Sequence, residues 1–534
     1  MMRPAVVTAK EAVDMIQDGS TLCGIGMTLI SASETVLKEI ERRFLEEGHP
    51  KDLTYFHTCG QAAMKTEFGL QRLAHEGLVK RIIGGHWGQA SRMMELISNN
   101  KIEAFNLPQG QMANMFHSMA LREPGKLSKV GLGTYIDPRI EGGKMNEKTK
   151  NCGYDTVAIV NVDGEEYIQY KPVKIDTLLI RGTHADENGN IDTAHEGMVL
   201  EVLPAVMATK RWGGKVICQV ERIVKAGSIS PKEVVVPGVL VDAIVVCENP
   251  IEEHRQTYNW YYDPSYSGQA LAPEQAAKPI PLTVRKAIGR RAMMELIPNQ
   301  IINAGTGIPN DVVGPIIAEE NIADMTMVTI ESGVYGGVPA ETIDFGISMN
   351  AQALIGHDRQ FELYNGTGCD YTFMGAGEMD QYGNVNATKM GPQAPGAGGF
   401  IDITATAKNV IFCSTFTGGG LKTSFSEEHG VTIEQEGKFK KLVKEVQQIS
   451  YNGRLAVERG QNMLYVTERA VFRLTEKGPM LIEIAKGVDL QRDVLDMMEF
   501  TPLIAEDLKV TDTAIYKDGP FGLRNIIANR GDNS

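Results

Sequence analysis

Hydrophobic positions recur at helical spacing close to the N-terminus of the chain. Between Ser31 and Gly48, apolar residues follow one another three or four positions apart, which is typical of an amphipathic helix; they are Val36, Leu37, Ile40 and Phe44. Ser31 and Glu34 have the spacing of a capping box, and glycine commonly ends a helix. We therefore expect a helix that begins near Ser31 and ends at Gly48.

Short apolar runs alternate with helical patterns along the rest of the chain. Runs at 176–180, 214–220 and 409–413 are rich in apolar and β-branched residues and predict β-strands. Strands that alternate with helices indicate an α/β fold with mostly parallel sheets.

Two patterns occur once in each half of the sequence. An apolar run that leads into a glycine turn and a helix occurs at 20–26 and at 300–309, and Asp, Gly and Asn at equal spacing occur at 186–191 and 380–385. A segment rich in Ala, Pro, Ser and Gly, typical of a linker, separates the halves. We expect two related open α/β domains from an internal duplication, at 1–272 and 285–534, with a linker at 273–284 and an active site in the cleft between them.

Charge and cysteine content restrict the function classes. The 534 residues carry a formal net charge of −14 and no basic cluster, which argues against nucleic acid or a membrane surface as partner and favours a small molecule. Seven scattered cysteines without a C-x-x-C pair favour a reducing compartment. No apolar run has the length of a signal peptide core or a membrane span. We expect a soluble, cytoplasmic protein.

Several familiar motifs are incomplete. The glycine pairs at 24–26 and 305–307 lack the third glycine of a dinucleotide fingerprint, and the glycines at 418–420 do not form a phosphate loop. The two His-Glu-Gly segments lack a second histidine at helical spacing, and no G-x-S-x-G elbow occurs. We expect no metal site, and histidines that cap helices, pack in the interior or lie on the surface.

Three segments place polar or glycine residues where chemistry is feasible. Glu331 directly follows the β-branched run 328–330, and ligands of open α/β sheets collect at the carboxyl ends of strands. The glycine-rich segment 395–402 is either a tight turn or a source of backbone N–H groups for an oxyanion. Gln109 lies between Pro108 and Gly110. Taken singly, Glu331 and Gln109 would be read as solvated loop residues.

Together, these segments resemble the family I coenzyme A transferases, in particular the short-chain acyl-CoA:acetate (propionate) CoA-transferase group. The resemblance is nearly full length and rests on co-linear motifs at 74–80, 84–88, 106–110, 131–134, 331–333, 396–402 and 467–472. In this family, two related α/β domains lie in one chain, which agrees with the duplication.

The resemblance implies roles for particular residues. The position of Glu331, in the second domain, is that of a nucleophile that attacks an acyl-CoA thioester and carries CoA as a glutamyl thioester. Gln109 and the amide of Gly398, with that of Ala397 as the alternative, correspond to the oxyanion hole. Asn303, Gly305 and Gly307 correspond to the acid pocket. Asn384 and Asn386 lie near that pocket by the same comparison, and a turn-forming role is equally open for Asn384.

We therefore expect an enzyme that moves CoA from a short-chain acyl-CoA to a free carboxylate such as acetate, propionate or butyrate. CoA and acyl-CoA are its substrates, and no permanently bound cofactor is expected, since one thioester is exchanged for another. An ionised Glu with an ordinary pKa would need no general base. An acyl-CoA hydrolase and a non-catalytic CoA-binding sensor are the alternatives. Size and duplication favour a homo-oligomer, a dimer or a tetramer.

Overall fold

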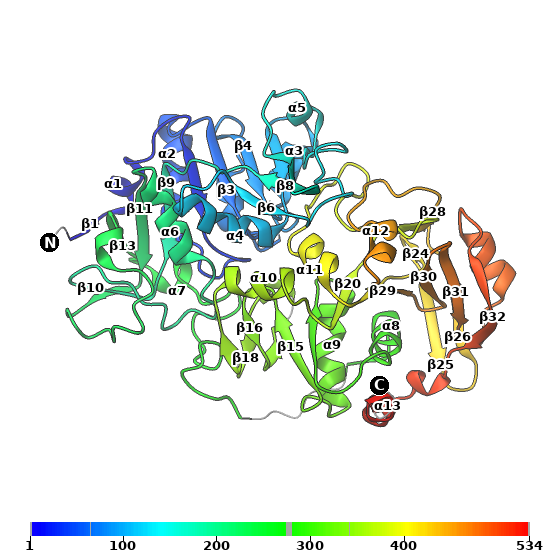
Figure 1. The fold of residues 1–534 in the computed structure, drawn as a ribbon. Helices are drawn as coiled ribbons and strands as arrows, with labels where there is room; N and C mark the ends of the chain where they lie inside the picture. Colours follow the sequence, from blue (N-terminus) through cyan, green and yellow to red (C-terminus); the bar gives the residue numbers. More distant parts are fainter. Residues whose placement is uncertain (1–2, 65, 274–279, 341, 532–534) are drawn as a thin grey trace. The chain divides into compact units, whose positions relative to one another are not determined.

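A computed structural model describes residues 3–64, 66–273, 280–340 and 342–531. The chain forms two compact units, each of which contains more than one stretch of sequence (Figure 1). The first unit comprises Met1–Ala272, Glu331–Glu362 and Gly391–Asp402. The second comprises Pro273–Ile330, Leu363–Met390 and Ile403–Ser534.

The first unit contains a sheet in which every strand pair is parallel. In spatial order its strands are β1 (Ala5–Val7), β13 (Ala243–Val246), β11 (Lys215–Val220), β9 (Thr177–Arg181), β2 (Thr21–Gly24), β3 (Leu53–His57), β4 (Val79–Gly84) and β5 (Glu103–Asn106). Strand interiors such as β9 and β5 are buried along their whole length, as expected for a sheet covered on both faces.

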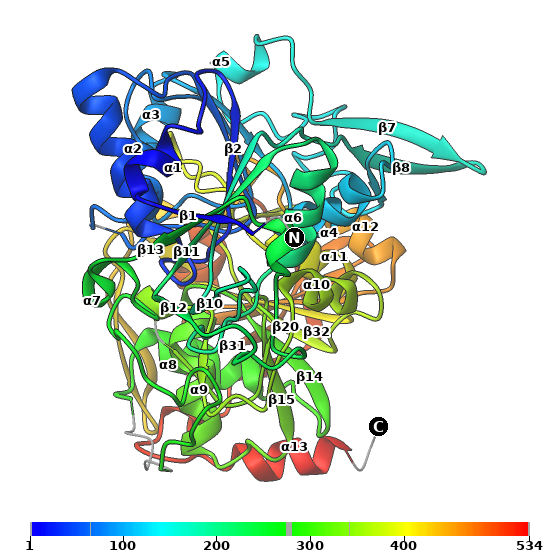
Figure 2. The ribbon, with the colours of Figure 1, turned by 90° about the vertical axis from the view of Figure 1, so that its left-hand side faces the viewer.

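Helices and small sheets complete this unit. The helices are α1 (Ala9–Val13), α2 (Glu34–Glu47), α3 (Ser91–Ser98), α4 (Gln109–Ala120), α5 (Glu147–Lys150), α6 (Val202–Arg211), α7 (Pro250–Glu253) and the first part of α10 (His357–Asn365). Figure 2 shows a long hairpin of β7 (Val157–Val162) and β8 (Glu165–Tyr170), which extends from the rest of the unit. Shorter pairs are β6 (Lys126–Ser128) with β8, β10 (His184–Asp186) with β12 (Arg222–Val224), β16 (Val334–Tyr335) with β19 (Ala353–Leu354), and β17 (Val338–Pro339) with β18 (Ser348–Met349).

The second unit contains a mixed sheet. Its strands run in the order β15 (Thr326–Ile330), β14 (Gln300–Ala304), β20 (Tyr371–Gly375), β23 (Asn409–Cys413), β29 (Asn462–Val466), β30 (Ala470–Thr475), β31 (Gly478–Ile484) and β32 (Leu503–Val510). The pairs from β15 to β29 are parallel, whereas β30 is antiparallel to both of its neighbours.

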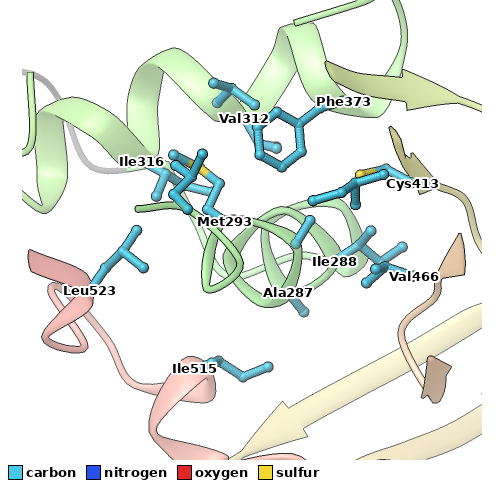
Figure 3. Packing of buried hydrophobic residues seen from close by; sticks show 14 of the residues in the cluster. Ala287, Ile288, Met293, Val312, Ile316, Phe373, Cys413, Val466, Ile515 and Leu523 are labelled. Atoms are coloured by element: carbon cyan, nitrogen blue, oxygen red, sulfur yellow. The ribbon is translucent and has the colours of Figure 1, made fainter. Parts of the chain in front are cut away.

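The core of the second unit lies between this sheet and its helices. Figure 3 shows Ile288 of α8 (Val284–Met293) and Val312 of α9 (Ile308–Glu319) packed with Phe373 of β20 and Val466 of β29. The remaining helices are α11 (Phe400–Thr406), which begins in the first unit, α12 (Gly453–Glu458) and α13 (Leu523–Gly531). Smaller sheets pair β21 (Glu378–Asp380) with β22 (Val385–Asn386) and β28 (Leu442–Val443), β24 (Thr417–Gly418) with β27 (Phe439–Lys440), and β25 (Lys422–Ser426) with β26 (Gly430–Gln435).

The two sheets share one strand order, as an internal duplication requires. The sequence β13-β11-β9-β2-β3 of the first sheet has the same connectivity as β29-β23-β20-β14-β15 of the second. Thr58 directly follows β3 and Glu331 directly follows β15, so these two residues occupy equivalent positions in the repeat.

The repeated Asp-Gly-Asn pattern forms the same turn twice. Oδ1 of Asp186 accepts the backbone N–H groups of Asn188 and Asn190, each at 2.9 Å. Oδ1 of Asp380 likewise accepts those of Tyr382 and Asn384, at 2.9 and 3.0 Å. The glycine inside each turn has a positive φ, 85° and 76°, which explains why glycine recurs there.

The predicted α/β class with mostly parallel sheets is confirmed. The predicted strands correspond to β9, β11 and β23, and α2 ends at Gly48, whose left-handed φ of 74° suits glycine. The predicted capping box is wrong, because the N-cap of α2 is Ser33, which makes no side-chain cap. Ser31 instead donates to Glu196, and Glu34 accepts the N–H of Gly69. All seven cysteines are free, as expected for a chain without a disulfide framework.

The compact units differ from the predicted domains in one respect. The first stretch of the first unit ends at Ala272, and much of the predicted linker 273–284 lies outside the described residues. The segments Glu331–Glu362 and Gly391–Asp402, predicted as part of a domain 285–534, belong to the first unit. None of the helices in the described ranges combines the length and apolar character needed to cross a bilayer.

Candidate functional site

Glu331, Gln109 and the glycine-rich turn all lie in the first unit. Glu331 follows β15 along the chain, and Gln109 is the first residue of α4. The side chain of Gln109 interacts with the Glu331 carboxyl group, and this interaction lowers the pKa of Glu331. The structure thus brings together two residues that the sequence separates by more than two hundred positions.

The environment of Glu331 changes its acidity. Burial raises the pKa of Glu331 to about 7. The positive charge of His357 and the interaction with Gln109 lower this pKa, but the effect of burial is larger, and the charge of Asp402 adds to it. Part of the residue surface nevertheless remains accessible. The expectation of an ordinary pKa is therefore wrong, because a carboxylate enclosed by protein atoms loses the hydration that stabilises its charge.

The N-terminus of α4 is held by a carboxylate from the glycine-rich segment. Asp402 accepts the backbone N–H of Gly110 and the side-chain amide of Gln111, both at 2.8 Å. A Cβ on Gly110 would lie 2.1 Å from the Phe361 ring, so only glycine allows this approach. These contacts fix the backbone from which the Gln109 side chain extends.

Asn106 connects the end of β5 to the glycine-rich turn. Its Nδ2 donates to the carbonyl oxygens of Gly84 and Gly85, at 2.8 and 2.7 Å, and its Oδ1 accepts the N–H of Ala397 at 2.9 Å. The N–H of Gly398 donates to the Gly85 carbonyl oxygen at 2.8 Å. Both amides predicted to line the oxyanion hole, those of Ala397 and Gly398, therefore already donate within the protein.

The turn nevertheless lies beside the Gln109 amide. A Cβ on Gly398 would lie 3.6 Å from Gln109 Oε1. The next residue, Gly399, is buried, and its backbone N–H donates to no residue in the described ranges. The oxyanion roles of Ala397 and Gly398 stay predictions, and the structure adds Gly399 as the amide that is not yet engaged.

A buried histidine outside the predicted site residues contacts Gln109. His357, the first residue of α10, has Nδ1 2.7 Å from Oε2 of Glu201 and Nε2 2.9 Å from Nε2 of Gln109. Glu201 also accepts the Thr58 hydroxyl, and Cys59 Sγ lies 3.6 Å from His357 Nε2. No motif surrounds His357, so only the folded structure reveals these contacts.

These side chains are removed from solvent. Glu201, His357, Thr58 and Cys59 are 0% exposed and Gln109 is 1% exposed. Burial alone would lower the pKa of His357, but the contacts with Cys59 and Glu201 outweigh burial and hold it well above its ordinary value. Burial raises the pKa of the Cys59 thiol.

The residues predicted to line the acid pocket lie in the second unit. Asn303 at the end of β14 donates to the Tyr364 hydroxyl at 3.1 Å, and its Oδ1 accepts the Thr372 hydroxyl at 3.1 Å. Gly305 and Gly307 form the turn between β14 and α9, and Gly307 has a φ of 88°. The side chain of Asn303 is thus engaged inside its unit, and its role in binding an acid stays a prediction.

Asn384 and Asn386 also form hydrogen bonds within the second unit. Nδ2 of Asn384 donates to Asp380 at 3.0 Å, and its Oδ1 accepts the N–H of Gly453 at 3.0 Å. Nδ2 of Asn386 donates to Glu378 at 2.7 Å. The turn-forming role of Asn384 accounts for both ends of its amide, and a substrate contact of either residue stays a prediction.

Comparison with known proteins defines the class. Residues 6–247 match the family model described as Coenzyme A transferase. The caffeate CoA-transferase of Acetobacterium woodii is 42% identical over 98% of this chain and 99% of its own length. The acetate CoA-transferase YdiF of Escherichia coli K12 is 39% identical over 97% of this chain and 96% of its own length. The chain therefore belongs to the coenzyme A transferase family and is an enzyme of that class.

A solved structure agrees in fold. The acyl-CoA transferase YdiF of Escherichia coli O157:H7, in a thioester complex with CoA, superposes with a TM-score of 0.90 at 38% identity, over 97% of each chain. The resemblance read from the sequence motifs is thereby confirmed.

Proposed function

We propose that this CoA-transferase moves CoA from a short-chain acyl-CoA to a free carboxylate of the acetate, propionate or butyrate class, through a glutamyl-CoA thioester on Glu331. The observation that carries the proposal is that Glu331, a residue at the end of a strand that keeps part of its surface accessible, has a carboxyl group that interacts with the buried Gln109 side chain. The similarity to an acetate CoA-transferase and to a transferase studied as a CoA thioester supports it.

The reaction begins with the ionised form of Glu331. The carboxylate attacks the carbonyl carbon of the acyl-CoA thioester, and collapse of the tetrahedral intermediate expels CoA thiolate and leaves an acyl-glutamyl anhydride. The thiolate then attacks the glutamyl carbonyl carbon, which gives the glutamyl-CoA thioester and releases the first acid. A second carboxylate reverses both steps and leaves as its own CoA ester.

Each addition places negative charge on a carbonyl oxygen. The Gln109 side chain interacts with the Glu331 carboxyl group, so its amide is suited to donate to an oxyanion that forms there. In the proposal, the second donor is a backbone amide of the glycine-rich turn: that of Gly398, with Ala397 as the alternative, or that of Gly399, since those of Ala397 and Gly398 also hold the turn in place. The protein contributes positioning and charge stabilisation, while the thioester supplies the free energy that is transferred.

The relatives leave two classes of acid as candidates. The similarity to a caffeate CoA-transferase favours an aromatic acid as the alternative to a short-chain acid. Competition between acetate, propionate, butyrate and caffeate for one pool of acyl-CoA would rank them by kcat/KM. The homo-oligomer, the cytoplasmic location and the absence of a bound cofactor stay predictions.

The test is intact mass spectrometry of the protein mixed with acetyl-CoA. Wild type and a Glu362→Gln control, which changes an exposed glutamate of α10 paired with Arg359, should gain the mass of CoA minus water and lose it when acetate is added. Glu331→Gln should gain nothing. Steady release of CoA without an adduct would instead favour the acyl-CoA hydrolase.

A further inference from the structure

Lys441 of the second unit lies at the edge of the sheet where open α/β proteins bind their ligands. It stands between β27 and β28, and its side chain reaches the segment that directly follows β23. Nζ donates to Oγ of Ser414 and to Oγ1 of Thr415, both at 3.0 Å. Since β23 runs parallel to β20 and β29, the Lys441 amine lies at the carboxyl ends of parallel strands.

The contacts of Lys441 leave one N–H group of its ammonium form unused. The Ser414 hydroxyl donates to the carbonyl oxygen of Ala376 at 2.8 Å, and the Thr415 hydroxyl donates to a carbonyl oxygen as well. Both hydroxyl oxygens therefore face Lys441 as acceptors. An ammonium group has three donors, and Nζ has no third acceptor among the residues that the structure describes. Part of the Lys441 surface remains accessible, so a ligand can supply that acceptor.

Lys441 also has no carboxylate partner in the described parts of the chain. Glu468 is close enough for its charge to act on the amine, but its carboxylate is paired with Arg469 at 2.8 Å and accepts the N–H of Phe416 at 2.9 Å. The buried cations described in the same unit are all paired: Lys286 and Arg290 with Glu319, Arg291 with Glu295 and Glu483, and Arg469 with Glu436 and Glu468.

The surroundings of Lys441 favour the binding of an anion. Burial lowers the pKa of Lys441, the charge of Glu468 opposes this shift, and the charge of Arg285 adds to it. A cation that is removed from water without a counter-ion is unfavourable. A bound anion would offset this cost, because its negative charge stabilises the ammonium form.

The substrate of a CoA-transferase carries suitable anions. CoA has phosphate groups at its nucleotide end, and they are present in both halves of the reaction. The chain has a formal net charge of −14, so a substrate with several negative charges needs local cations. The carboxylate of the acid substrate is a poorer ligand for this amine, because it has to remain free as a nucleophile.

We propose that Lys441 binds a phosphate group of the CoA substrate. This inference deepens the proposed function, since it rests on acyl-CoA as substrate and adds a residue that recognises its nucleotide end. Ser414 and Thr415 hold the amine in place, and the remaining N–H group donates to a phosphate oxygen. Because the phosphate groups take no part in the chemistry, the contact should contribute equally to binding of the substrate and of the transition state.

Two thioesters that differ in their phosphate groups test the proposal. Acetyl-pantetheine has the thioester and the pantetheine arm of acetyl-CoA but no phosphate group. Lys441→Met, which removes the charge and keeps a long side chain, should raise KM for acetyl-CoA about 10- to 100-fold with kcat within about twofold. KM for acetyl-pantetheine should stay within about twofold. Lys441→Arg, which keeps the charge, should recover part of the loss.

The adjacent lysine provides the matched control. Lys440 is exposed, and its Nζ donates to the backbone carbonyl oxygens of Asp496 and Met498, at 3.0 and 3.2 Å. Lys440→Met should leave both KM values unchanged. An equal rise of KM for both thioesters in Lys441→Met would indicate disturbed packing, and equal effects of the two lysine variants would indicate unspecific attraction. Either result would overturn the inference.

Calorimetric titration with free CoA separates this inference from the nucleophile assignment. In a Glu331→Gln background, Lys441→Met should weaken CoA binding by the same 10- to 100-fold, and inorganic phosphate should compete with CoA only when Lys441 is present. Unchanged CoA affinity would overturn the inference, whatever the role of Glu331. Phosphate binding by Lys441 without any preference for acetyl-CoA over acetyl-pantetheine would assign the site to a free anion and overturn it as well. Transfer activity retained by Glu331→Gln would instead overturn the nucleophile assignment.

Discussion

At the scale of single residues, we expect the acidity of Glu331, the proposed nucleophile, to determine when the enzyme is competent. A nucleophilic carboxylate must be ionised, and burial holds the pKa of Glu331 at about 7 rather than in the usual range of a glutamate. Burial therefore lowers the ionised fraction of the carboxyl group at neutral pH. Once ionised, the poorly hydrated carboxylate is a more reactive nucleophile.

The first prediction concerns the pH dependence of activity. The kcat/KM for acyl-CoA should fall about tenfold per pH unit below about 7, because only the ionised fraction of the Glu331 side chain attacks. The measurement is a kcat/KM profile from pH 5 to 9 in buffers of constant ionic strength. An acid limb near pH 4 would contradict the raised pKa.

The second prediction concerns stability. A carboxyl group whose pKa is raised on folding binds its proton more tightly in the native state, so folding is penalised as pH rises from the unfolded toward the folded pKa. Glu331→Gln, which is neutral at every pH, should match wild type below pH 4.5 and exceed its free energy of unfolding by up to about 3 kcal/mol above pH 7. Urea unfolding at pH 4.5 and pH 8 measures the difference, and a gain that is equal at both pH values would argue against this linkage.

At the scale of elements, the N-terminus of α4 links packing to chemistry. The Asp402 carboxylate occupies the first turn, where helix N–H groups have no partner of their own, and it also suits the positive end of the helix dipole. Because Gln109 is the first residue of the helix, any movement of that turn displaces its amide relative to Glu331.

The third prediction follows from this turn. Gly110→Ala should destabilise the protein by about 1–3 kcal/mol and lower kcat, since the new Cβ would lie 2.1 Å from the Phe361 ring and 2.9 Å from the Asp402 carboxyl carbon. Gly418→Ala is the control, because the atom it approaches most closely is the far end of the Lys441 side chain. Thermal unfolding and kcat are measured on both variants. Equal changes in Gly110→Ala and Gly418→Ala would contradict the argument.

Some elements could be predicted from the sequence, whereas contacts between distant elements could not. Strands and α2 followed from periodicity because burial imposes it locally. The Ser31 and Glu34 pair had the right spacing for a capping box, but tertiary contacts to Glu196 and Gly69 use both side chains instead. The contacts of His357 with Glu201 and Gln109 join residues 156 and 248 positions apart, and no local pattern records such contacts.

At the scale of the whole molecule, an internal duplication explains why the two halves contain similar elements that serve different purposes. The two sheets keep one strand order and the two Asp-Gly-Asn turns keep one hydrogen-bond pattern. The residues after β3 and β15 differ, as a threonine and a glutamate. The strand order and the turns have thus been retained, whereas the position of the proposed nucleophile differs between the halves.

The fourth prediction uses the duplicated turns. Asp186→Ala and Asp380→Ala each remove a carboxylate that accepts three backbone N–H groups and one side-chain amide, and each should cost about 1–3 kcal/mol. Hydrogen exchange read by mass spectrometry should report the loss in the first unit for Asp186→Ala and in the second for Asp380→Ala. Effects spread evenly over both units by either variant would contradict independent turns.

The first unit is built from three stretches of chain, so activity can arise only late in synthesis. A ribosome that has released residues up to 272 has supplied the whole eight-stranded sheet and Gln109, but neither the proposed nucleophile Glu331 nor the glycine-rich turn. Only after residue 402 emerges are Glu331, His357 and Asp402 all present. The nascent enzyme therefore stays chemically silent through roughly three quarters of its translation, and no shorter N-terminal fragment can consume acyl-CoA by this route.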